Sequence, residues 1–365
     1  MQKYFAMFAL VALAATGCAA EKEPATQASG ASTVSADDVV EVDDLVAQDA
    51  DEAGAAKVGE PAIWRAYAAE AAKNAHAHVK SALQHVKDLA VGEPTRKGTT
   101  KVGSLEWAVW EKKTGEVTVK LVVIKVTDKR RRYILFGKKG TEAAKVLLTG
   151  VFVKAGKKTG GGRFHINLGN VTAVTGATPA LEGSIHFWFA NKRASFHARR
   201  IVYRGVKVST DKTAVANNAG MDYVRFAGKG GRFRAVAVGP KVLPNRDGVE
   251  AMALRMVWAS GKGGRLDGVI AAVTPTPGRL LEVHECWNAK GLREAYKDDA
   301  KPADKTEADV GDVTKCGDLA AEKIDEKIAN ENGQDKDDEA EAEFKESGAA
   351  EIDEATAGEA VDPEA

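Results

Sequence analysis

The sequence predicts a mainly β protein, all-β to α+β, built as a curved antiparallel meander or open half barrel of about 12 strands. From residue 102 onward, apolar and polar side chains alternate with a period of two, in short segments separated by Gly, Lys, Asn and Asp. Residues 61–90 follow a helical period instead, which predicts one amphipathic helix packed on the apolar face of the sheet.

The predicted helix has recognisable ends. Pro61 suits its first position, where no backbone N–H is needed. From Trp64 onward, apolar side chains recur three and four residues apart. Gly92 and Pro94 stop this pattern, so we expect the helix to end near Ala90.

The predicted strands bury one face each, as is typical of antiparallel sheets. The clearest apolar faces are Phe164, Ile166 and Leu168; Ile185, Phe187 and Phe189; and Met252, Leu254, Met256 and Trp258. The opposite face is rich in Arg, Lys, His and Trp. Two more short helices are predicted at residues 141–146 and 289–296.

One hairpin register follows from the sequence. A two-residue turn at residues 191–192 places Phe187 opposite Phe196 and His186 opposite His197. Asn tolerates the positive φ that such a turn requires, although the usual following Gly is absent.

A four-residue motif occurs twice. Gly161-Gly162-Arg163-Phe164 recurs as Gly230-Gly231-Arg232-Phe233, and each copy begins a strand. Duplication of a sheet unit accounts for this pattern, and so does convergence of glycine-rich hairpin tips. The side-chain parities that follow the two copies do not align cleanly, which counts against a recent duplication.

The first twenty residues have the layout of a secretory signal. Lys3 precedes an apolar run that is too short to span a bilayer, and small residues follow it. The stretch Ala15-Thr16-Gly17-Cys18 resembles the lipobox of bacterial lipoproteins, although Ala stands where that class usually has Leu. The resemblance implies cleavage before Cys18 and acylation of this cysteine. It also implies export, with Ala19 favouring the outer membrane. The alternative is an ordinary signal peptide with an incidental cysteine.

Charge is strongly segregated along a chain whose formal net charge is zero. Residues 21–60 hold 11 acidic and 2 basic side chains, residues 298–365 hold 24 and 7, and residues 61–297 hold 17 and 42. Segments this acidic and poor in aromatic residues bury too little apolar surface to offset the entropy of ordering.

These contrasts predict four parts. They are a lipoprotein signal peptide at 1–17, an acidic disordered tether at 18–59, a basic β-rich domain at 60–297 and an acidic low-complexity tail at 298–365. Cys286 and Cys316 are the two cysteines beyond Cys18, and in an exported protein such a pair predicts a disulfide. Closing a loop of this length stabilises the fold by roughly 3–4 kcal/mol. The alternative is two free thiols.

Catalytic motifs are scarce. No phosphate-binding loop, dinucleotide fingerprint or nucleophile elbow is present, and no carboxylate pair of the glycosidase type stands out. His165, His186 and His197 have a parity that would place them on one face of the sheet, where three imidazoles suit Zn²⁺. The other interpretation is scattered surface histidines. We therefore expect no cofactor, no metal and no enzymatic activity.

The basic charge is the best indication of function. The candidate anion-binding residues lie mostly in predicted turns: Lys129, Arg130, Arg131, Arg132, Lys157, Lys158, Lys192 and Arg193. Such a field attracts polyanions. Outside the cytoplasm these are anionic lipids or acidic polysaccharides, and no nucleic acid is expected. The alternative is that these side chains only keep a β protein soluble. A third interpretation is that the acidic segments at both ends fold over the basic β-rich domain and compete with its ligand.

The expected function is that of a lipid-anchored, non-enzymatic protein of the cell envelope, facing the periplasm or the surface, that binds an anionic or amphiphilic ligand. A half barrel with one helix resembles, in architecture only, the periplasmic lipoprotein carriers, which implies a concave face for acyl chains. The first alternative is a structural or surface-interaction lipoprotein with a solid core. The second is a metal-dependent enzyme.

Overall fold

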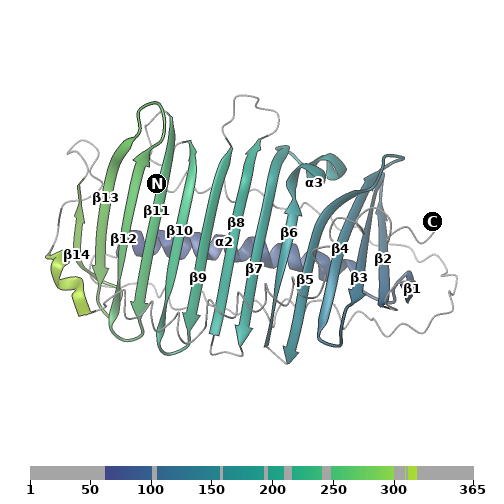
Figure 1. The fold of residues 1–365 in the computed structure, drawn as a ribbon, viewed down its shortest axis with the longest axis horizontal. Coiled ribbons are helices and arrows are strands. Elements are labelled where there is room, and N and C mark those ends of the chain that lie inside the picture. Colours follow the sequence, from purple (N-terminus) through teal and green to yellow (C-terminus); the bar gives the residue numbers. More distant parts are fainter. Residues whose placement is uncertain are drawn as a thin grey trace.

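The protein forms one open antiparallel sheet that is crossed by a long helix (Figure 1). The computed structural model describes residues 62–100, 105–156, 159–192, 196–208, 216–240, 248–299, 309 and 311–318. Fourteen strands follow one another across the sheet in chain order, which makes it a simple meander. The predicted fold class is confirmed, with two more strands than expected.

The first seven strands are β1 (Arg96–Thr99), β2 (Glu106–Thr114), β3 (Val117–Lys125), β4 (Arg130–Lys139), β5 (Lys145–Gly156), β6 (Thr159–Asn167) and β7 (Leu181–Lys192). The other seven are β8 (Phe196–Val208), β9 (Asn217–Phe226), β10 (Gly230–Pro240), β11 (Val249–Ala259), β12 (Gly263–Ala272), β13 (Gly278–Trp287) and β14 (Arg293–Asp298). The helices are α2 (Ile63–Leu89), the short α3 (Leu168–Thr175) and the 3₁₀ helix η5 (Val313–Asp318).

The long helix α2 joins two hydrophobic cores on the same face of the sheet. Near its start, Trp64 and Ala68 are buried with side chains of β10 to β14. Near its end, Leu83 and Val86 are buried with side chains of β2 to β9. At 1.5 Å per residue the helix is about 40 Å long, and it therefore spans about eight strand spacings. We call this side of the sheet the helix face and the opposite side the outer face.

A buried carboxylate holds the start of α2. Ala62 precedes the helix and provides no side-chain cap. Glu285 of β13 caps the helix instead. Its Oε2 accepts hydrogen bonds from the backbone N–H groups of Trp64 (2.8 Å) and Arg65 (3.2 Å). Its Oε1 accepts from Nε of Arg293 at 3.0 Å. Glu285 is fully buried, so its charge depends on these donors and on the positive end of the helix dipole.

Replacing Glu285 with Ala should lower the free energy of unfolding by about 3–5 kcal/mol, since the change removes the carboxylate that binds Nε of the buried Arg293 and accepts from two helix N–H groups. Glu285→Gln keeps an acceptor for the helix N–H groups and should cost less. Urea denaturation measures both. Glu282→Gln, on a partly exposed carboxylate of the same strand, is the control. A Glu285→Ala loss no larger than the control's would show that α2 does not depend on this anchor.

The repeated glycine motif has a packing explanation. In β6 and β10, the second glycine of each copy lies opposite an aromatic residue of the next strand: Gly162 opposite Phe189, and Gly231 opposite Trp258. A third instance, Gly263-Gly264-Arg265-Leu266, begins β12 and places Gly264 opposite Trp287. A Cβ atom on any of these second glycines would crowd the ring across from it. The shared letters therefore follow from a shared contact between a glycine and an aromatic ring.

Two predicted helices are wrong, and one helix was missed. In place of the helix predicted at 141–146, a turn leads into β5 at Lys145, and in place of the helix predicted at 289–296, a turn leads into β14 at Arg293. Both strands pair with their neighbours in the sheet. The missed helix α3 begins at Asn167, whose side chain accepts from the backbone N–H of Asn170, and it ends at Gly176 with φ of 68°. Its buried side chains extend the core under β4, β5 and β7.

The predicted hairpin register is also wrong. Lys192 pairs with Phe196, so three residues connect β7 to β8 in place of two. Phe187 therefore lies opposite Ile201, and His186 lies opposite Val202. The longer connection shifts the pairing by an odd number of residues and moves His197 to the helix face.

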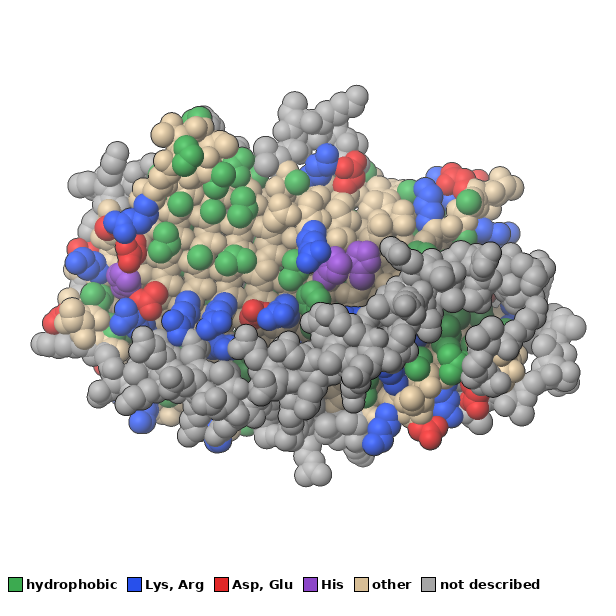
Figure 2. Space-filling model, in the orientation of Figure 1, with side chains coloured by type: hydrophobic (Ala, Val, Ile, Leu, Met, Phe, Trp, Pro, Cys, Tyr) green, Lys and Arg blue, Asp and Glu red, His purple; other side chains and the backbone are tan. Residues whose placement is uncertain are grey.

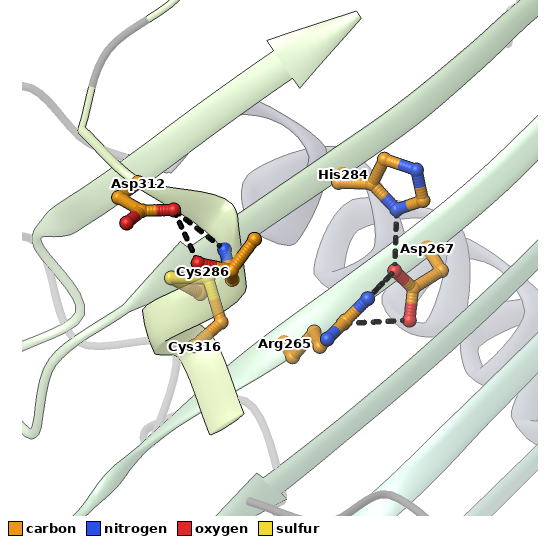
Figure 3. The surroundings of a disulfide bond; sticks show 7 residues. Arg265, Asp267, His284, Cys286, Asp312 and Cys316 are labelled. Atoms are coloured by element: carbon orange, nitrogen blue, oxygen red, sulfur yellow. Dashed lines mark hydrogen bonds and ion pairs between the residues drawn. A yellow bond between two sulfur atoms is a disulfide. The ribbon is translucent and has the colours of Figure 1, made fainter. Parts of the chain in front are cut away.

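The predicted disulfide is present. Cys286 of β13 is bonded to Cys316 of η5, with a Cα–Cα distance of 5.9 Å (Figure 3). Cys286 pairs in register with Arg265 of β12. The disulfide therefore fixes η5 on the outer face, beside Arg265.

Several predicted features lie outside the described residues. They are the signal peptide, Cys18, the acidic tether and, beyond residue 318, the acidic tail. Among the residues that the structure does describe, no helix is both long enough and apolar enough to cross a membrane.

Candidate functional site

Charged side chains line up across the outer face because the strand registers place them opposite one another. One continuous row of paired residues is Arg200, Asp222, Arg234, Arg255, Asp267, His284 and Lys297, from β8 to β14. Neighbouring strands are about 4.8 Å apart, so the charges of this row follow one another at close, regular spacing.

The glycine motifs add further cations to this surface. Arg163, Arg232 and Arg265 follow the paired glycines, and each precedes an apolar residue that points to the helix face. Alternation along a strand therefore directs these arginines outward. We define the arginine belt as Arg163, Arg200, Arg232, Arg234, Arg255 and Arg265. It extends over β6 to β12, or about 29 Å, and includes two carboxylates, Asp222 and Asp267.

Like charges are crowded in the middle of the belt. The pKa of Arg232 is lowered, first by burial and then by Arg234, Arg200 and Arg255, while Asp222 acts in the opposite direction. Asp222 also binds Arg200, whose Nε donates to Oδ1 at 2.5 Å. Arg234, Arg200 and Arg255 thus lie close enough to Arg232 to oppose its charge, and Asp222 acts in the other direction.

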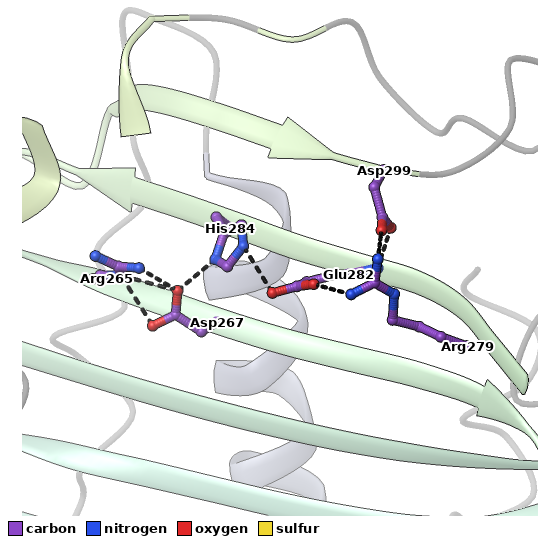
Figure 4. A network of polar contacts seen from close by, with 6 residues as sticks. All are labelled: Arg265, Asp267, Arg279, Glu282, His284 and Asp299. Carbon is purple, nitrogen blue, oxygen red and sulfur yellow. Dashed lines mark hydrogen bonds and ion pairs between the residues drawn. The ribbon is translucent and has the colours of Figure 1, made fainter. Parts of the chain in front are cut away.

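The far end of the belt is balanced differently. A chain of ion pairs and hydrogen bonds joins Arg265, Asp267, His284, Glu282, Arg279 and Asp299 (Figure 4). Burial alone would raise the pKa of Asp267, but hydrogen bonds from Arg265 and His284 outweigh it and lower this pKa. Three carboxylates meet two arginines and one histidine here, so this end of the outer face is close to neutral.

Planar rings cluster beside Arg163 and Arg200. The imidazoles of His165 and His186 are stacked, with ring centroids 4.4 Å apart, and the indole of Trp188 lies 6.1 Å from His186. Burial and the nearby charge of Arg204 lower the pKa of both histidines, and His165 also contributes to the shift at His186, which reaches about 4. Both rings are therefore neutral near pH 7.

The three-histidine metal hypothesis fails on geometry. His165 and His186 lie on the outer face, whereas His197 shares the parity of Ile201 and Tyr203, which belong to the core under α2. The sheet therefore separates His197 from the other two. Within the described part of the chain, no group of three His, Cys, Asp or Glu residues is arranged to hold a metal ion.

The predicted cationic turn residues lie in different environments in the structure. Arg131 is buried, and its Nη1 donates to the backbone oxygens of Thr127 and Arg130, so it stabilises its own turn. Lys129 is exposed in that turn, Arg130 is partly exposed, and Arg132 lies on the outer face opposite Val151. Lys157, Lys158 and Arg193 lie outside the described residues, as does the side chain of Lys192. The belt cannot be recognised from the sequence alone, because its members lie side by side only through strand register.

The outer face changes character toward β2. Val109, Val122 and Ile134 form a separate apolar cluster there, with Trp107, Ile124, Phe136 and Val146 partly buried around it. Apolar side chains are also exposed beyond the charges on β10 and β12, where Val236, Val238 and Val269 lie. Figure 2 shows the outer face with Lys, Arg and His side chains near its middle and apolar side chains above the charges toward one end.

Comparison of the chain with protein-family models, with curated proteins and with solved structures gives no match. The candidate site therefore rests on its own chemistry, that of cations and neutral rings on a rigid sheet.

Stability should depend on pH through the two stacked histidines. Their folded pKa values lie below the unfolded value of about 6.5, so the unfolded chain takes up protons first as the pH falls. The contribution of these histidines to the free energy of unfolding should therefore decrease as the pH falls from 6.5 to about 4. Below that pH this contribution should stay constant. In the variant His165→Asn/His186→Asn, this decrease should shrink by about 1 kcal/mol, allowing for solvent screening of partly exposed rings.

Urea denaturation at pH 7 and at pH 4.5 measures this difference. All carboxylates are shared by the two proteins, so their contribution cancels in the comparison. An identical pH dependence in both would show that the rings titrate in the folded protein as they do in the unfolded chain.

Proposed function

We propose that this is a non-enzymatic protein of the cell envelope, held at the membrane by a lipid on Cys18, whose arginine belt binds an anionic ligand. The observation that carries the proposal is a row across β6 to β12 in which Arg163, Arg200, Arg234 and Arg255 are in register with two aspartates, while Arg232 and Arg265 lie in the adjacent row. Guanidinium groups bind carboxylate, sulfate and phosphate oxygens through paired hydrogen bonds, which suits a ligand with repeated oxyanions.

The arrangement favours an extended ligand. Successive strands present their side chains about 4.8 Å apart, so a chain lying across the strands meets a cation at most steps. A sheet also keeps these positions fixed, which reduces the entropy lost on binding. A polymer with regularly spaced negative charges, such as an acidic polysaccharide, fits this pattern better than a small anion does.

The packing of α2 bears on the rival functions. A carrier of acyl chains needs an apolar cavity on the helix face, but Leu83, Val86 and Trp64 are buried there against the sheet. This observation favours the outer face as the binding surface. A purely structural lipoprotein remains the alternative, since a solid core fits it equally well, and ligand binding separates the two.

Reversing charge in the belt should weaken binding. The full chain with Arg234→Glu/Arg255→Glu should bind a fluorescent polyuronate at least about tenfold less tightly, because each lost hydrogen bond between charged groups is worth about 1.5–3 kcal/mol. For the unchanged protein, the logarithm of affinity should fall linearly with the logarithm of salt concentration. Fluorescence anisotropy at several salt concentrations gives both results.

The matched control is Lys138→Glu/Lys139→Glu, which makes the same charge change at exposed positions outside the belt. Its affinity should stay within about twofold of the unchanged protein, apart from a small long-range effect that salt screens. Equal losses in the two variants would show that overall charge, and not the belt, attracts the ligand.

The acidic segment 319–365 should compete with the ligand. It holds 17 acidic and 4 basic residues, and the disulfide at Cys316 ties its start to the strand that pairs with Arg265. A tethered segment acts at a high effective concentration. Replacing its 17 acidic residues with Asn and Gln should therefore raise polyuronate affinity severalfold, an effect that high salt should reduce.

The same replacement of the 11 acidic residues in 21–60 is the control, because this segment enters the fold through α2. A similar gain from both replacements would indicate general repulsion of the ligand by negative charge. No gain from the first would mean that residues 319–365 do not compete.

A further inference from the structure

The belt contains a cluster of planar side chains that a purely electrostatic surface would not need. We call Trp188, His186 and His165 the ring cluster. Their planes are nearly parallel, at 23° between the imidazoles and 18° between His186 and Trp188. All three side chains are partly exposed on the outer face, and Figure 2 shows two imidazoles side by side in the middle of that face.

Arginines surround the ring cluster. Trp188 pairs in register with Arg163 on one side and with Arg200 on the other. Arg204 is close enough to affect the charge of both imidazoles. Trp188 thus interrupts the cationic row at one place, with an arginine on each flank, and the paired imidazoles lie in the next outer-face row.

The polar atoms of these rings have capacity for a ligand. The structure shows one hydrogen bond in the cluster, between Nε2 of His186 and the Ser184 hydroxyl at 3.3 Å. In the described part of the chain, the indole N–H of Trp188 and both ring nitrogens of His165 have no hydrogen-bond partner in the protein. None of these atoms is buried. The cluster therefore offers an indole donor and a neutral imidazole with one donor and one acceptor.

We propose that the ring cluster is a sugar-binding subsite, and that the ligand of the belt is an acidic glycan. This inference rests on the proposed function and specifies its ligand. The apolar C–H face of a pyranose ring packs on the aromatic rings, its hydroxyl groups bond to the indole and imidazole nitrogens, and its carboxylate or sulfate binds Arg163 or Arg200.

Two other ligands, a polyphosphate and a membrane surface, match fewer properties of the ring cluster than an acidic glycan does. A polyphosphate presents only charged oxygens, so neutral rings between arginines would weaken its binding. A membrane surface is bound through protruding apolar side chains beside cations. The outer face does expose Val236 on β10 and Val269 on β12, but the ring cluster lies on β6 and β7 and consists of rings that carry polar nitrogens. A sugar acid uses all three features: charge, ring faces and neutral hydrogen-bonding groups.

The test compares two polyanions of matched charge on the full chain: polygalacturonate, which has sugar rings, and inorganic polyphosphate, which has none. Isothermal titration calorimetry measures both affinities for the unchanged protein, Trp188→Ala, Trp188→Phe and Arg163→Gln/Arg200→Gln. Trp188→Ala should weaken polygalacturonate binding about tenfold and change polyphosphate binding less than about twofold. Trp188→Phe should restore part of the loss, and the arginine variant should weaken both ligands.

Circular dichroism and thermal unfolding show whether the variants keep the fold, and Trp188→Phe provides the comparison if Trp188→Ala unfolds. Equal effects of Trp188→Ala on the two polyanions, or no effect on either, would overturn the subsite while leaving the belt as an anion-binding surface. Absence of any polyanion binding by the unchanged protein would overturn the proposed function as well. Tighter, Trp188-dependent binding to vesicles of anionic phospholipid would identify a lipid headgroup and overturn the glycan.

Discussion

The contact between Glu285 and the first turn of α2 is the constraint on which the rest of the structure depends. A sheet of fourteen strands in simple order has only local pairings, and nothing in the meander itself links its two ends. The helix supplies that link, because Trp64 belongs to the core cluster of β10 to β14 and Val86 belongs to the core cluster of β2 to β9. A buried anion that accepts two helix N–H groups fixes where the helix begins and therefore which strands it covers.

Covering one face with a helix leaves the other face available for side chains that a core would exclude. The parity of each strand then decides its chemistry: Phe164 and Phe233 point to the helix, and the adjacent Arg163 and Arg232 point outward. Close contact between glycine and aromatic rings brings the strands into a defined register in three places. The same register aligns the arginines, so stability and surface chemistry have a common origin in strand pairing.

The sequence predicted what depends on local periodicity. The long helix, the antiparallel meander and the disulfide follow from spacing and composition, and all three are confirmed. The register between β7 and β8 could not be predicted, since a connection longer by one residue changes every pairing beyond it. The arginine belt could not be predicted from the sequence for the same reason. Its members are up to about a hundred residues apart in the chain and lie side by side only when seven strands are aligned. The helix α3 left a weaker signal, an Asn cap and a closing Gly176.

The crowding of arginines has a cost in the folded protein. Arg200, Arg234 and Arg255 each lower the pKa of Arg232, which means that the folded state brings together charges that the unfolded chain keeps apart. Within the belt, Asp222 binds Arg200 and Asp267 binds Arg265, so carboxylates offset part of this repulsion. Bound oxyanions would remove the repulsion, so a ligand of negative charge should stabilise the fold through the same residues that recognise it.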